Sequence, residues 1–174
     1  MHRRGLYRST GFSFIELLVY IAISSMLFVI IISLYFALAQ ARLRQQSIAE
    51  VETQGLTAMN LLLQTIRNTH SINSPVLGTS AASLTLNPYA TTTKPTVFDL
   101  ASSTLRISES GTAPVTLTSA QVLISNLTFQ NTGRPGTLGS VKIVFTVAHA
   151  TSSKYGSQYS KTFYGSATVR RTPQ

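Results

Sequence analysis

The sequence predicts an α+β protein, in which one long N-terminal helix packs against a C-terminal antiparallel β-sheet domain. Three observations predict this fold class. An apolar run without charged residues extends from Leu17 to Ala41. Apolar residues then recur at near-helical spacing as far as Ile66. Beyond Pro75 the apolar period changes to two, which is typical of strands that bury one face.

Residues 12–41 are long and apolar enough to form a membrane-spanning helix. About 20 apolar residues suffice to cross a hydrocarbon core of roughly 30 Å. The preceding residues 1–11 contain Arg3, Arg4 and Arg8 and no acid. Because basic flanks stay in the cytoplasm, we expect the chain to sit in a bacterial inner membrane with its C-terminal domain outside the cytoplasm.

Glu16 is the one acidic residue in this membrane segment. A carboxylate at membrane depth costs at least about 2.5 kcal/mol, and the polar side chains from Leu17 to Gln40 are all neutral. We therefore expect a partner from outside the helix. The plainer alternatives are a secretory signal peptide, with a small-x-small site at residues 37–39, and a simple membrane anchor. The apolar run is too long for the first, and the second leaves Glu16 unexplained.

The stretch G-FSFIELLVYIAI, from Gly11 onward, resembles the start of the type IV prepilin superfamily, which contains type IV pilins and the pseudopilins of type II secretion and DNA uptake. The resemblance implies a pilin-like fold and a leader, residues 1–11, that prepilin peptidase removes after Gly11, with N-methylation of Phe12. It also implies that Glu16 pairs with the N-terminal amine of a neighbouring subunit during assembly. A buried pair of opposite charges serves register better than it serves stability.

Two departures from the pattern of many major pilins favour a minor subunit. The chain has no cysteine, so it lacks their C-terminal disulfide, and it has no proline between Phe12 and Ser74. The strand-like segments and the closing T-V-R-R most resemble the J-type minor pseudopilin of type II secretion, although H- and I-type subunits share this layout. The resemblance implies a structural subunit of a periplasmic or cell-surface filament. Its partners would be other pilin or pseudopilin subunits, prepilin peptidase and an inner-membrane assembly platform.

Residues 42–74 are predicted to continue the helix outside the membrane as an amphipathic segment. The helix is expected to end near Ser71, because the residue before Pro75 avoids the α region. Gly55 is a weak point in its interior, costing about 1 kcal/mol relative to alanine. The apolar positions that should face the sheet are Leu43, Ile48, Val51, Met59, Leu62 and Ile66.

Residues 75–174 are predicted to form one antiparallel sheet with one buried face. In residues 140–149, for example, Val141, Ile143, Phe145 and Val147 alternate with a second set of side chains. The expected strands are residues 83–89, 96–101, 104–108, 114–118, 122–130, 140–149 and 161–170.

Little in the sequence supports catalysis, a metal or a cofactor. Of the five acidic residues only Asp99 and Glu109 fall in the C-terminal domain, and the histidines are scattered. No pair stands at a spacing that suits acid–base chemistry or metal ligation. We therefore expect no enzymatic activity, no cofactor and no metal site.

The basic charge of the C-terminal domain leaves a second interpretation open. Residues 75–174 contain eight basic and two acidic side chains. Cations and aromatic rings alternate in one segment, which suits stacking on single-stranded nucleic acid or on sugars. The alternative function is thus a minor pilin that acts as a DNA or surface-polymer receptor. A plainer interpretation is a solvated loop that leads into an edge strand protected by lysines, with weak DNA binding at most. The candidate polymer-binding residues are Lys154, Tyr155, Tyr159, Lys161 and Tyr164.

Overall fold

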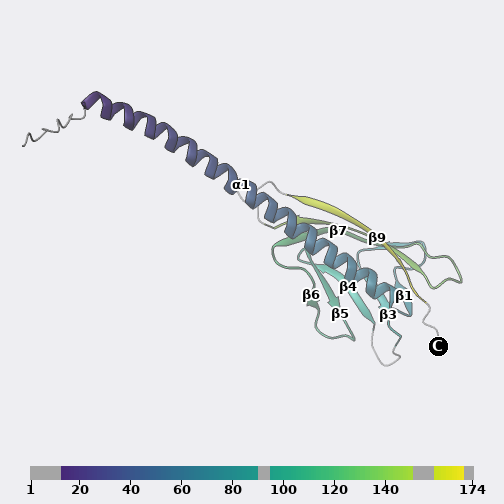
Figure 1. Ribbon diagram of the computed structural model, residues 1–174. Helices are drawn as coiled ribbons and strands as arrows, with labels where there is room; N and C mark the ends of the chain where they lie inside the picture. The colour runs from purple at the N-terminus through teal and green to yellow at the C-terminus, as the bar shows by residue number, and fades with distance from the viewer. Residues whose placement is uncertain (1–12, 90–94, 151–158, 171–174) are drawn as a thin grey trace, which may run out of the picture. The chain divides into compact units, whose positions relative to one another are not determined.

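The computed structural model describes residues 13–89, 95–150 and 159–170 (Figure 1). The chain divides into two compact units, Met1–Arg42 and Leu43–Gln174. One helix, α1 (Phe14–Arg67), begins in the first unit and ends in the second.

In the first unit, α1 is apolar and its side chains are not buried. Every large apolar side chain from Phe14 to Leu38 is at least 42% exposed. The most apolar window of α1 has a mean hydropathy of 2.7, and none of it is buried. By length and composition α1 could therefore cross a membrane.

The second unit contains two antiparallel sheets. The first sheet has the order β1-β3-β4-β5-β6, and the second sheet has the order β2-β7-β8-β9. The strands of the first sheet are β1 (Ser71–Ser74), β3 (Leu84–Asn87), β4 (Thr96–Ala101), β5 (Thr104–Ser108) and β6 (Val115–Thr116). Those of the second sheet are β2 (Ser80–Ala81), β7 (Val122–Asn131), β8 (Ser140–His149) and β9 (Ser160–Thr168).

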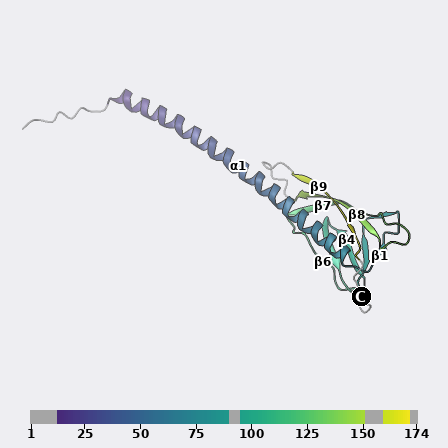
Figure 2. The ribbon, with the colours of Figure 1, turned by 45° about the vertical axis from the view of Figure 1, so that its right-hand side comes forward.

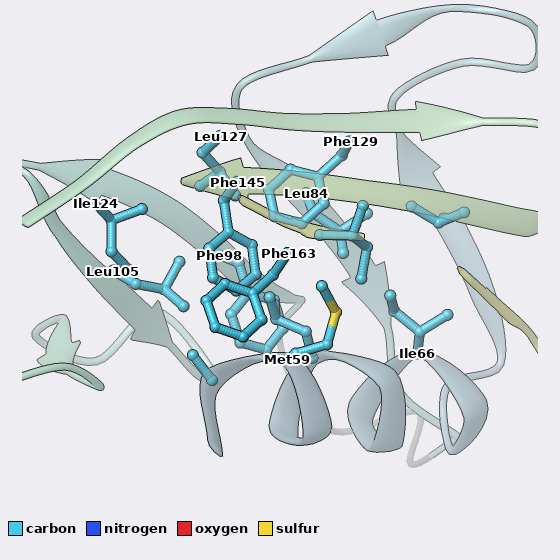
Figure 3. Packing of buried hydrophobic residues seen from close by; sticks show 14 of the residues in the cluster. Met59, Ile66, Leu84, Phe98, Leu105, Ile124, Leu127, Phe129, Phe145 and Phe163 are labelled. Atoms are coloured by element: carbon cyan, nitrogen blue, oxygen red, sulfur yellow. The ribbon is translucent and has the colours of Figure 1, made fainter. Parts of the chain in front are cut away.

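The inner faces of both sheets and the C-terminal part of α1 bury one common core (Figures 2 and 3). Alternation explains which strand residues enter it. In β8 the four residues expected inside, Val141, Ile143, Phe145 and Val147, are at most 1% exposed. The fold is therefore α+β, as predicted, but the strands divide into two sheets where the sequence suggested one.

The buried stripe of α1 begins later than predicted. Val51, Met59, Leu62 and Ile66 are buried as expected, whereas Ile48 is half-buried. Leu43 is 52% exposed, so its assignment to the core was wrong. Packing on the sheets starts at Val51, and small residues complete the stripe: Gly55 and Ala58.

The helix also ends earlier than predicted, at Arg67 instead of near Ser71. The backbone carbonyl of Asn87 accepts a hydrogen bond from the Thr69 hydroxyl (2.6 Å) and another from the His70 amide (2.8 Å). These bonds draw the chain out of the helix, and residues 71–74 then pair with β3 as β1. The sequence signal for β1 is weak, because S-I-N-S contains a single apolar residue.

Strand β7 contains a bulge that changes which of its side chains face the core. The register against β8 shifts between Ser125 and Thr128, and Asn126 has a φ of 55°. Before the bulge Val122 and Ile124 are buried, and after it Leu127 and Phe129 are. One extra residue keeps both apolar pairs on the inner face, although their spacing breaks the period of two.

Candidate functional site

The first site residue, Glu16, lies in the first turn of α1. The backbone carbonyl of Ser13 accepts hydrogen bonds from the amides of Glu16 (3.0 Å) and Leu17 (3.2 Å), so Ser13 occupies the N-cap position. Ser13 and Glu16 thus stand at the spacing of a capping box. A carboxylate here is also favoured by the positive end of the helix dipole. This signal, S-F-I-E, was present in the sequence and was missed.

The length of the apolar run defines when Glu16 needs a partner. The 25 residues from Leu17 to Ala41 carry no charge, and at 1.5 Å per residue they span roughly 37 Å. This exceeds a hydrocarbon core of roughly 30 Å. The helix can therefore span the membrane while Glu16 stays at the membrane–water interface. The carboxylate requires a partner only where it lies within a low-dielectric environment such as the hydrocarbon core. Within the described residues, no hydrogen bond or ion pair engages this carboxylate.

Four of the predicted site residues lie outside the described residues. They are Gly11 and Phe12, at the expected cleavage point, and Lys154 and Tyr155, in the candidate polymer-binding segment. Cleavage between Gly11 and Phe12 stays a prediction.

Two members of the candidate polymer-binding segment contact α1. The Lys161 ammonium lies 2.8 Å from a carboxylate oxygen of Glu52, and the Tyr159 hydroxyl donates to the same oxygen at 3.4 Å. The hydrogen bond and charge of Lys161 lower the pKa of Glu52, and the same hydrogen bond raises the pKa of Lys161. The Lys161 ammonium also lies 5.7 Å from the ring centroid of Phe163. Lys161 of β9 and Tyr159, which directly precedes β9, therefore both contact the helix through Glu52.

Tyr164 does not belong to this group. Successive residues of a strand point to opposite faces of its sheet, and Phe163 is buried while Tyr164 is 70% exposed. The structure therefore places Tyr164 on the face of the second sheet that is turned away from the core. Tyr159, Lys161 and Tyr164 form no common cluster.

Two glycines allow close contact between α1 and β9. A methyl group at Gly55 of the helix would collide with the ring of Phe163, and one at Gly165 of β9 would collide with the sulfur of Met59. Each glycine thus receives the side chain of the opposite element, and Phe163 further stacks on Phe145, with 5.6 Å between the ring centroids (Figure 3). By helix propensity alone, Gly55 is only a weak point of the helix. Its position in the apolar stripe, four residues from both Val51 and Met59, was the available signal.

The acidic and histidine side chains of the second unit form no metal cluster among the described residues. Asp99 pairs across strands β4 and β5 with Arg106, at 3.0 Å from Nε to Oδ1 and 2.6 Å from Nη2 to Oδ2. Both carboxylate oxygens of Asp99 thus accept bonds from one guanidinium.

Fold and site together define a class of protein: an α+β chain with an N-terminal helix that could anchor it in a membrane. The apolar surface of that helix is its most extensive exposed feature among the described residues. No family model, curated protein or solved structure matches the chain.

Proposed function

We propose that this chain is a structural, non-enzymatic minor subunit of a type IV pilus-like or type II secretion-like filament. Prepilin peptidase would process it in the inner membrane, and it would assemble through its N-terminal helix. The observation that carries the proposal is the exposed apolar surface of α1 from Phe14 to Leu38. It is joined to the sequence Gly11-Phe12 and to the carboxylate of Glu16.

The apolar surface needs a covering, because exposed apolar area is unfavourable in water. A bilayer covers it in the free subunit, and the helices of neighbouring subunits cover it in a filament. In a low-dielectric helix bundle an unpaired carboxylate is costly. The N-terminal amine of a neighbour, freed by cleavage after Gly11, supplies the opposite charge to Glu16. Because the pair forms in one register only, it selects the correct stagger between subunits.

The alternative is a minor pilin that acts as a receptor for DNA or surface polymers. The candidate polymer-binding segment gives it less support. Lys161 and Tyr159 are both engaged by Glu52. A cation already paired with a carboxylate neutralises less phosphate charge, so fewer counterions leave the nucleic acid on binding. Receptor activity through these residues would require the contact with α1 to open.

Processing and assembly provide the test. In a host with prepilin peptidase and an assembly machine, mass spectrometry should find a mature chain that begins with N-methylated Phe12. Sheared filaments should contain the wild-type chain and far less of the Glu16→Gln variant, because a neighbour's buried ammonium then lacks its counter-charge. The Glu16→Gln variant should still insert into the membrane and be cleaved, since removing the charge makes insertion easier.

The matched control is Glu109→Gln, which removes an exposed carboxylate of the second unit and should leave incorporation unchanged. A mature chain beginning at Gln40 would show a secretory signal peptide instead. Incorporation of Glu16→Gln at the wild-type level would remove the assembly role of this residue.

A further inference from the structure

The outer face of the second sheet carries an exposed aromatic ring midway along β9, its edge strand. Tyr164 of β9 lies opposite Val144 of β8, and Val144 lies opposite Thr128 of β7. Tyr164 is 70% exposed, although tyrosine rings in sheets usually gain energy by packing on cross-strand neighbours. The ring is therefore available to a ligand.

Short hydroxyl-bearing side chains flank this ring along β9. Thr162 and Ser166 lie two residues before and after it on the same face of β9. The Thr162 hydroxyl lies 2.9 Å from that of Thr146 on β8. Such short side chains leave Tyr164 largely exposed, and side-chain positions on one face of a sheet repeat at roughly 6.8 Å along each strand and roughly 4.8 Å between strands.

The charge of this face does not suit a polyanion. Among the described residues of β7, β8 and β9 that point outward, Lys142 is the only charged one. Affinity for nucleic acid grows with the number of phosphates that are neutralised, and one lysine neutralises about one. The face also lacks the contiguous apolar area that marks the core of a protein interface. Its larger apolar side chains, Leu123 and Val144, lie on different strands and are not cross-strand neighbours, since Leu123 pairs with Ala148 and Val144 with Thr128.

We propose that this outer face binds a neutral polysaccharide chain, with Tyr164 of the edge strand β9 as the main contact. The C–H face of a sugar ring would stack on the tyrosine, whose π system carries negative charge on its face. The hydroxyls of the sugar would exchange hydrogen bonds with the threonine and serine hydroxyls, which can each donate and accept. This inference is independent of the filament proposal, since it needs only the second sheet and an accessible outer face.

The test uses the full chain in detergent micelles on an array of neutral polysaccharides, acidic polysaccharides and single-stranded DNA. Wild type should be retained by at least one neutral polysaccharide. Tyr164→Ala should weaken that binding by about threefold to tenfold, the equivalent of one aromatic contact, whereas Tyr164→Phe keeps the stacking ring and should retain it. The matched control is Val115→Ala, which trims an exposed side chain on β6 and should change nothing.

A second variant blocks the face without touching the tyrosine. The chain has no cysteine, so Ser166→Cys can be labelled at one position with a bulky maleimide, and the labelled protein should lose binding that the unlabelled variant keeps. Three results would overturn the proposal: no neutral polysaccharide retains the wild type, the retained polysaccharide binds Tyr164→Ala equally well, or the chain binds only DNA and acidic polymers with loss on Lys142→Gln.

Discussion

At the residue scale, the close contact between α1 and β9 depends on two glycines, because each leaves space for a side chain of the opposite element. Gly55 admits the ring of Phe163, and Gly165 admits the sulfur of Met59. In an isolated helix a glycine is a liability, because it costs about 1 kcal/mol relative to alanine. Here the missing side chain is what allows the helix to approach the strand.

Gly55→Ala should therefore destabilise the protein, against the usual direction for glycine in a helix. The gain in helix propensity is about 1 kcal/mol, whereas overpacking a core costs typically about 1–3 kcal/mol. Phe163 cannot easily yield, since it is 7% exposed and stacks on Phe145. Denaturant unfolding of the full chain in detergent should show the loss.

The control is the same substitution in a Phe163→Leu background. With the ring removed, Gly55→Ala should become neutral or stabilising. A stabilising effect of Gly55→Ala in the wild-type background would contradict the close packing.

The ion pair between Glu52 and Lys161 should give the second unit a defined pH response. The pKa of Glu52 is lowered below its ordinary value of 4.5. Its contribution to the free energy of unfolding is therefore complete above pH 4.5 and is lost as the pH falls through the lowered pKa. The pKa of Lys161 is raised, so its contribution to the free energy of unfolding is complete below pH 10.5 and is lost as the pH rises through the raised pKa. The pair is exposed, so added salt should reduce its effect.

Melting temperatures measured between pH 3 and 7 provide the check. The fall in melting temperature towards acid pH should be smaller in Glu52→Gln than in wild type. A matched substitution, Glu109→Gln, should leave the wild-type profile of melting temperature against pH unchanged. Identical profiles for wild type and Glu52→Gln would show that the pair contributes nothing.

At the element scale, the sequence predicted strands well where apolar residues alternate over several positions. Strands β4, β5 and β8 have the predicted bounds, and β7 and β9 differ from theirs by one or two residues. Alternation identified these strands because one face of each is buried. Strands β1 and β2 were missed because they are short and polar, and they exist through pairing with β3 and β7. The division into two sheets was not predictable either, since pairing between distant segments leaves no local pattern.

The bulge in β7 gives a prediction at this scale. Asn126 adopts a positive φ of 55°, a region that costs most side chains about 1–2 kcal/mol and that glycine and asparagine tolerate. Asn126→Gly should be nearly neutral, whereas Asn126→Val should destabilise by about 1–2 kcal/mol. Equal unfolding midpoints for the two variants would show that β7 is not held in this conformation.

At the scale of the whole molecule, the sequence predicted a long N-terminal helix packed on antiparallel strands, and the roles of the site residues stay predictions. The apolar period identified the helix and the strands, and a lone carboxylate marked Glu16. Tyr159 and Lys161 contact Glu52, whereas Tyr164 lies on the opposite face of the sheet, because successive residues of a strand point to opposite faces. Polymer binding by these residues stays a prediction. The contact of Lys161 with Glu52 depends on how α1 packs against β9, which no local sequence pattern gives.

The second unit should fold without the first. Residues 43–174 form a compact unit and contain the entire buried core. Produced from residue 45 or 47 onward, it should be soluble and monomeric, with a cooperative thermal transition. EDTA and reducing agents should leave the transition unchanged, since the chain has no cysteine and the described residues hold no metal cluster. Circular dichroism and sedimentation velocity test this, and a melting temperature lowered by EDTA would reveal a metal site.

The contact of α1 with β9 also determines when the second unit can complete its fold. Glu52 and Lys161 are 109 positions apart in the chain, and β9 ends at Thr168 of 174 residues. Folding slows as contacts join more distant parts of a chain, and here the helix surface around Gly55 stays uncovered until the last strand arrives. This surface is therefore accessible to chaperones and proteases until β9 has paired with β8. A truncation that removes β9 would leave it accessible permanently.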